Sequence, residues 1–85
     1  MNKKNLRILD KLFEHPTRSD VEWNEAMGAL KALGAVVTEG KGSAVRIRLN
    51  EVRAVFHKPH PRKELGKYLV EDIRDLIVSS GVTWK

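Results

Sequence analysis

Histidine and arginine are the side chains of this sequence that could act on a phosphodiester without a metal, and they gather in one stretch. Arg46 lies in the run AVRIRL, while Arg53 and His57 lie in the run VRAVFH that follows it. A neutral histidine can take the proton from a ribose 2′-hydroxyl, whose oxygen then attacks the adjacent phosphate. Arginines stabilise the negative charge that builds on phosphorus. These residue types fit cleavage of RNA, although a histidine at the end of a strand is also common without a catalytic role.

Other kinds of catalytic site find less support in the sequence. The chain has no cysteine, and no cluster of carboxylates accompanies its three histidines, so we expect no metal site. The glycine turn at residues 40–42 does not match a nucleotide-binding P-loop, and no Ser-His-Asp order stands out. We therefore expect neither a metal nor another cofactor.

The two basic runs are predicted to form a hairpin. If Asn50 and Glu51 make a two-residue turn, counting back from the turn gives the register of the two strands. The side chains that then face inward are apolar: Val45, Ile47, Leu49, Val52, Ala54 and Phe56. The other face receives Arg48 opposite Arg53, Arg46 opposite Val55, and Ala44 opposite His57. This assignment depends on the turn, because a slip of one residue would move every side chain of a strand to the other face.

Elements on both sides of the hairpin would hold it in place. Apolar residues recur at helical spacing over residues 3–14, 21–33 and about 68–80, with Ser19 or Asp20 as the N-cap of the second helix. Glycines follow the second and third helices at positions 34 and 81, where a left-handed residue ends a helix. A short β-branched strand is predicted at residues 35–39, before the strands at 44–49 and 52–57, and a loop at 58–63.

The predicted order, α-α-β-β-β-α, indicates an α+β fold. Its last five elements have the order of the double-stranded-RNA-binding domain (dsRBD), in which two helices cover one face of a three-stranded antiparallel sheet. A chain of 85 residues is too short for two cores. We expect one domain over residues 1–85, with an N-terminal helical extension at 1–16 and a dsRBD-like core at 20–82. The extra helix would either pad the core or touch a partner.

The positive charge is concentrated on the hairpin and the loop after it. Residues 41–67 hold eight Lys/Arg and two Asp/Glu, whereas residues 1–40 hold six of each and residues 68–85 hold two and three. A local excess of this kind is typical of a protein that binds a polyanion, and nucleic acid is the expected partner. No apolar run approaches the length of a membrane span, and the absence of cysteine favours the cytoplasm.

Three parts of the sequence resemble the HicA family of toxins, over about residues 23–82. They are the glycine turn with Gly42 and Ser43 entering a basic strand, the strand ending VFHKPHP, and the closing helix ELGKYLVEDIRDLIVSSGV. The resemblance implies the toxin of a type II toxin–antitoxin pair, with a dsRBD-like fold and metal-independent cleavage of mRNA. It also implies an antitoxin, HicB, that covers the active face, so the toxin would be a monomer alone and part of a hetero-oligomer with HicB.

One position departs from the family in a way that bears on catalysis. The family's active-site histidine usually follows the G-x-S of the turn, and the matching residue here is Ala44. Three explanations stay open: an alanine introduced to silence a toxic nuclease, another catalytic residue in this subgroup, or a copy that binds RNA without cutting it. The candidate catalytic positions are then Ser43, Ala44 and His57. The candidate RNA contacts are Lys41, Arg46, Arg48, Arg53 and Lys58.

Two functions of other classes remain as alternatives. One is a non-catalytic nucleic-acid-binding module, either dsRBD-like or a winged helix that uses the hairpin as its wing on DNA. The winged helix is the weaker form, because no third helix precedes the hairpin. The other alternative is a protein-binding subunit whose basic face docks an acidic partner.

Overall fold

The predicted hairpin is present, and the elements around it follow the predicted order. The computed structural model describes residues 1–84. Its elements are α1 (Lys3–Leu12), α2 (Trp23–Ala32), β1 (Val36–Glu39), β2 (Ala44–Leu49), β3 (Val52–His57) and α3 (Lys67–Ser80). The α+β fold with three helices and a three-stranded antiparallel sheet is thereby confirmed. None of the helices in residues 1–84 combines the length and the apolar character that crossing a membrane requires.

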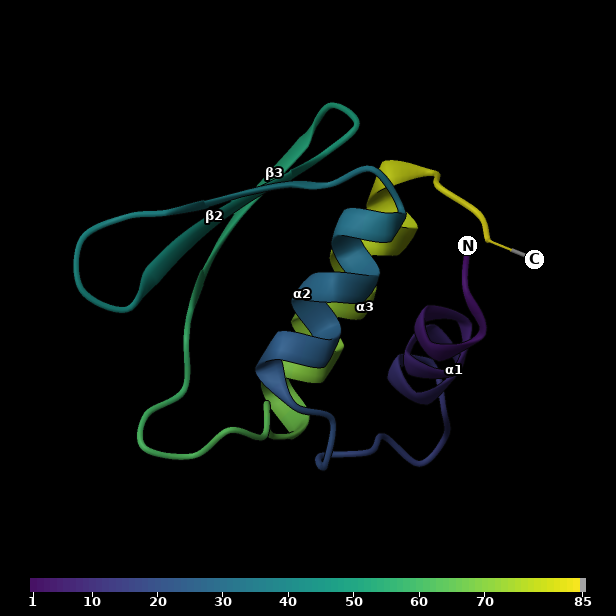
Figure 1. Cartoon of the computed structure of the whole chain (residues 1–85), viewed down its shortest axis with the longest axis horizontal. Helices are drawn as coiled ribbons and strands as arrows, with labels where there is room; N and C mark the ends of the chain where they lie inside the picture. The colour runs from purple at the N-terminus through teal and green to yellow at the C-terminus, as the bar shows by residue number, and fades with distance from the viewer. Residues whose placement is uncertain (85) are drawn as a thin grey trace.

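The elements form three layers. The sheet has the strand order β1-β2-β3, and α2 and α3 lie side by side against one of its faces (Figure 1). Helix α1 packs on α2 and α3 from the side away from the sheet (Figure 1). The helix pair is therefore covered on both sides, while the second face of the sheet carries no helix.

The register of the hairpin agrees with the prediction at all positions. Leu49 pairs with Val52 next to the turn, and Ala44 pairs with His57 at the far end. Asn50 takes a positive φ of 54° in the turn, a conformation that asparagine tolerates better than most residues. Its side-chain Nδ2 donates a hydrogen bond of 2.9 Å to the carbonyl of Ser80, so the turn is attached to the end of α3.

The core lies between the sheet and the two helices that cover it, and it continues between those helices and α1. The predicted inward residues Val45, Ile47, Leu49 and Phe56 are buried, whereas Val52 and Ala54 are half-buried. From the helices the core receives Trp23, Ala26, Met27, Ala29, Leu30, Val70, Ile73, Leu76 and Ile77. On α3, Val70 is fully buried and the neighbouring Leu69 is partly buried against the core.

Helix α2 starts later than predicted because its first residues pair with a distant segment. The Trp23 N–H donates to the Lys63 carbonyl at 2.8 Å, and the Leu65 N–H donates to the Val21 carbonyl at 2.9 Å. The N-cap is consequently Glu22, whose N–H donates to Oε1 of Glu25 at 3.1 Å, and the predicted cap at Ser19 or Asp20 is wrong. These bonds also fix the basic loop that follows β3 against the start of α2.

The first strand begins one residue later than predicted because of the way in which α2 ends. The Gly34 N–H donates to the Lys31 carbonyl and the Ala35 N–H to the Leu30 carbonyl, which is the Schellman pattern of helix ends. Gly34 has the expected positive φ, at 104°. Because the Ala35 N–H is used by the helix, β1 begins at Val36 instead of the predicted residue 35.

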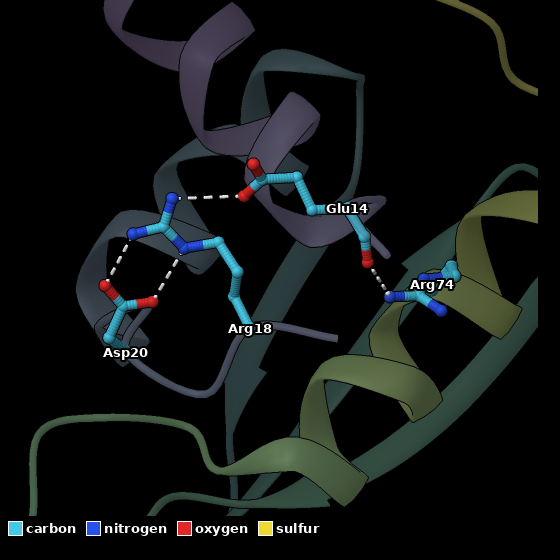
Figure 2. A network of polar contacts seen from close by, with 4 residues as sticks. All are labelled: Glu14, Arg18, Asp20 and Arg74. Atoms are coloured by element: carbon cyan, nitrogen blue, oxygen red, sulfur yellow. Dashed lines mark hydrogen bonds and ion pairs between the residues drawn. The ribbon is translucent and has the colours of Figure 1, made fainter. Parts of the chain in front are cut away.

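Helix α1 is attached to the rest of the chain by a buried face and by one arginine. Ile8, Leu9 and Leu12 are buried, so α1 is part of the core. Nε of Arg74 donates to the Leu12 carbonyl at 2.9 Å. Its Nη2 donates to the Glu14 carbonyl at 3.3 Å, as Figure 2 shows. Helix carbonyls in the last turn lack partners within the helix, so α3 supplies donors that α1 needs.

A second arginine, Arg18, forms ion pairs within the connection between α1 and α2. Arg18 donates to both carboxylate oxygens of Asp20, at 2.9 and 2.8 Å, and to Glu14 at 3.1 Å (Figure 2). The hydrogen bonds from Arg18 lower the pKa of Asp20 to about 2. The same contacts raise the pKa of Arg18 above its already high ordinary value.

Candidate nucleic-acid interface

The face of the sheet without helices, which we call the open face, is organised in rows across the three strands. Pairing of β1 with β2 sets Val36 beside Arg48 and Thr38 beside Arg46. Pairing of β2 with β3 sets Arg48 beside Arg53 and Arg46 beside Val55. The first row is therefore Val36, Arg48 and Arg53, the second is Thr38, Arg46 and Val55, and the third is Ala44 and His57.

The open face is positively charged without compensation from its own strands. Arg46, Arg48, Arg53 and His57 are exposed, as the alternation of the two basic runs predicts. Within the three strands, no aspartate or glutamate shares this face with them. Arg48 and Arg53 stand directly opposite each other, a pairing of like charges that is destabilising in a bare sheet. A bound anion would relieve this repulsion.

A hollow of about 580 Å³ lies over the first two rows. The side chains of both rows line it: Val36, Thr38, Arg46, Arg48, Arg53 and Val55. We call it the valine–arginine hollow. Sequence reasoning missed the contribution of β1, because the sequence does not fix how many residues the glycine turn before β2 takes, whereas the two-residue turn between β2 and β3 sets its register.

The third row holds the candidate catalytic positions. Oγ of Ser43 lies 3.3 Å from Nδ1 of His57, which is within hydrogen-bond reach. The backbone keeps the two residues together, because the Lys58 N–H donates to the Ser43 carbonyl at 2.9 Å. When Nδ1 carries the ring proton and donates to Ser43, Nε2 of His57 is free to accept a proton. Ala44, directly opposite His57, contributes no group that transfers protons.

The turn before β2 brings Ser43 and Ala44 to His57. The Gly40 N–H donates to the Ala44 carbonyl at 2.8 Å, and the Ala44 N–H donates to the Lys41 carbonyl at 3.3 Å. Gly42 has a positive φ of 61°, which the reversal of the chain requires. Lys41 and Lys58, both exposed, lie in this turn and directly after β3, at the same end of the hairpin as the third row.

His60, which follows the third strand, lies apart from the third row of the open face. His60 lines a smaller hollow of about 270 Å³, between residues 58–63 and the start of α2. Glu22 and Asn24 line the same hollow, next to Lys58 and Arg62. Across residues 1–84, no three His, Cys, Asp or Glu side chains group so that they could hold a metal ion.

The comparisons with known proteins give one match. The HicA toxin of bacterial toxin–antitoxin systems is the family that matches, and it covers residues 23–78. No curated protein and no solved structure gave a match. The matched residues comprise α2, the sheet and most of α3, so they include the open face and leave α1 outside. A toxin of this kind has an antitoxin as its partner. The match covers well over half of the 85 residues, and the chain belongs to the HicA toxin family of bacterial toxin–antitoxin systems.

Proposed function

We propose that this protein is a toxin that binds mRNA on its open face and belongs to a metal-independent endoribonuclease type whose activity is weakened here by Ala44. A HicB-type antitoxin would neutralise it in the cytoplasm, as one partner of a hetero-oligomer. The observation that carries the proposal is the placement of three arginines and His57 on a sheet face whose strands add no carboxylate. Such a face attracts a polyanion.

Binding is assigned to the cations. Arg46, Arg48 and Arg53 would hold phosphates, since a guanidinium donates two parallel hydrogen bonds to a phosphate. Lys41 and Lys58 would extend the contact beyond the third row, where the RNA backbone leaves the sheet. Ser43 would donate a hydrogen bond to a phosphate oxygen when it is not bonded to His57. The N-terminal residues 1–16 are proposed as an extension that stabilises the RNA-binding core at 20–82.

Cleavage is assigned to the third row. Nε2 of His57 would accept the proton of a 2′-hydroxyl, the 2′-oxygen would bond to phosphorus, and the bond from phosphorus to the 5′-oxygen would break. The products would be a 2′,3′-cyclic phosphate and a 5′-hydroxyl, so the departing oxygen needs a proton. Cβ atoms of directly opposed strand residues lie about 4.5–5.5 Å apart, so a histidine at position 44 would stand beside His57 and could supply it. Ala44 cannot.

A second candidate function is RNA binding without cleavage. The observation that favours it is Ala44 itself, because the row that holds His57 contains no second proton-transfer group. The binding residues would be the same, and the toxin would act by occupying RNA.

The replacement Ala44→His separates the two functions. Purified wild-type protein, Ala44→His and the control Ala44→Asn are incubated with labelled RNA in the presence of EDTA, and products are resolved on a gel. We expect Ala44→His to cleave RNA much faster than the wild type and Ala44→Asn, with growth arrest when it is expressed without an antitoxin. If Ala44→His binds RNA and leaves it intact, the nuclease function is wrong and the binding function stands. Preference of all three proteins for duplex DNA over RNA would refute both.

A further inference from the structure

We propose that the valine–arginine hollow is a subsite for an unpaired nucleobase. This inference rests on the proposed function, and it specifies the form of RNA that the open face takes. The base would pack on Val36 and Val55, and the arginines of the same two rows would hold the phosphates on either side of it. The open face would thus select single-stranded RNA, although the order of its elements is that of a domain that binds duplex RNA.

The exposure of two valines is the first observation behind the proposal. Val36 is 50% and Val55 is 57% exposed, and both line the hollow. The other large apolar side chains that are exposed in residues 1–84 are Met1, Tyr68 and Val78, at the N-terminus or on α3. Single exposed apolar residues are ordinary, but here two of them lie in one hollow that three arginines also line. The apolar side chains suit the base of a nucleotide, and the arginines suit its phosphate.

The shape of RNA decides between a duplex and a single strand. In an A-form duplex the base faces are stacked on one another, and proteins contact its phosphates and 2′-hydroxyls. Such contacts would use Arg46, Arg48 and Arg53 and leave both valines against water or sugar. A splayed base presents a flat apolar face that side chains and guanidinium planes can cover. The volume of about 580 Å³ falls in the range of sites for small ligands.

Charge favours RNA over a protein as the occupant. Three arginines and one threonine line the hollow beside the valines, together with Ile47 and Ala54, and no carboxylate lines it. An apolar side chain of a protein partner would gain from the valines but would have to leave the arginines unpaired or bring acids for each of them. A nucleotide brings its own negative charge next to its apolar face.

The place of the hollow relative to the third row gives it a role in specificity. Val55 and His57 are two residues apart on β3, which is about 6.6 Å along a strand. A nucleotide with its base over Val55 would therefore present its sugar and phosphate near His57. The base in the hollow would determine which phosphodiester is cut by an active form of the protein.

The test is an equilibrium binding measurement with the wild-type chain, in which Ala44 should keep cleavage slow enough for binding to reach equilibrium. Fluorescence anisotropy compares a labelled, unstructured 12-nucleotide RNA with the same strand in abasic form and with a 12-base-pair duplex. We expect the base-bearing strand to bind at least about fivefold more tightly than the abasic strand, as contacts to base faces usually provide. The comparison needs no variant, so it does not depend on the folding of one.

Two variants locate the effect. Val36→Thr/Val55→Thr keeps the shape and the β-branching of both side chains but makes them polar, and Val78→Thr on α3 is the matched control. We expect the double variant to lose about fivefold in affinity for the base-bearing strand and nothing for the abasic strand. Val78→Thr should bind both strands like the wild type.

Several outcomes would overturn the subsite. They are equal binding of the abasic and base-bearing strands, tighter binding of the duplex, or equal behaviour of the double variant and Val78→Thr. Different outcomes would overturn the proposed function. They are the failure of every RNA to bind and the absence of any effect of Arg48→Gln on binding. Loss of affinity on Arg48→Gln with no discrimination of bases would keep the function and reject the subsite.

Discussion

Ala44 pairs with His57 directly across the two ends of the β2–β3 hairpin, and Ser43 lies 3.3 Å from the ring of the same histidine. Three residues that the sequence separates by up to 14 positions thus meet at one end of the open face. If a histidine at position 44 restores cleavage, we expect His57 to take part in the reaction.

The first prediction concerns the dependence of position 44 on His57. If Ala44→His restores cleavage, the double variant Ala44→His/His57→Gln should cleave about 100-fold more slowly, since a positioned base contributes on that order. The rate of cleavage of labelled RNA in EDTA measures this. His60→Gln serves as the control, because His60 lines a different hollow and should leave the rate unchanged. Equal rates for the single and double variants would show that His57 takes no part in the reaction.

The second prediction is that Arg48 weakens the fold while it strengthens binding. Arg48→Gln removes one of two like charges that face each other across the hairpin, so the free energy of unfolding should stay equal or rise by a few tenths of a kcal/mol. RNA affinity should fall, and the slope of log affinity against log salt should become shallower by about 0.7. Urea denaturation and anisotropy titrations over salt measure the two effects. Arg7→Gln, on the exposed side of α1, should change neither the slope nor the affinity.

The third prediction concerns the attachment of α1. Arg74→Met removes the donors to the Leu12 and Glu14 carbonyls and the contact with the Phe13 ring, whose centroid lies 5.8 Å from the guanidinium carbon. We expect the free energy of unfolding to fall by about 1–3 kcal/mol, as for other hydrogen bonds made by charged groups. Hydrogen exchange in α1 should quicken at the same time. Lys31→Met, an exposed change on α2, should stay within about 0.5 kcal/mol of the wild type.

The fourth prediction concerns acid stability. The pKa of Asp20 is about 2 in the folded chain, below its ordinary value of 3.8, chiefly because Arg18 hydrogen-bonds to its carboxylate. As the pH falls, the carboxylate of Asp20 is therefore protonated at a higher pH in the unfolded chain than in the folded chain. The contribution of Asp20 is therefore fully present above about pH 4 and is lost as the pH falls through about 2.

Carboxyl NMR titration of Asp20 measures this directly. In Arg18→Gln the pKa of Asp20 should return toward 3.8, and the fall in stability between pH 4 and 2 should become smaller. Lys31→Gln should leave the titration as it is in the wild type. A wild-type Asp20 that titrates near 3.8 would show that the ion pair does not persist in solution.

The sequence was most informative where local rules decide the structure. Alternation of apolar and basic residues, with a two-residue turn between the runs, predicted the bounds of β2 and β3 and all of their pairs. The left-handed glycines at 34 and 81 were likewise confirmed. Each of these features depends on residues that are close in the chain, so their physical causes can be read from the chain alone.

The remaining features depend on contacts between distant segments. The start of α2 is set by pairing of Val21 and Trp23 with residues 63–65, and no local pattern announces that pairing. The place of Val36 on the open face follows from the register of β1 across the turn at residues 40–43, and the sequence did not fix the length of that turn. Nothing in the sequence indicated that Arg74 would donate a hydrogen bond to the Leu12 carbonyl at the end of α1. The roles of Ser43, Ala44, His57 and the cations in binding and cleavage stay predictions.

The layered arrangement of the chain also decides how it should be handled at the bench. Met1 lies on the α1 side, and the ring of Trp84 packs 4.8 Å from that of Phe13, so the first and last described residues both lie away from the sheet (Figure 1). A tether fused before Met1 would hold the molecule with its open face toward the solution. Random coupling through amines would instead modify Lys41 and Lys58 beside the third row. If the open face binds RNA as proposed, a biosensor made by amine coupling would report an affinity lowered by the attachment chemistry.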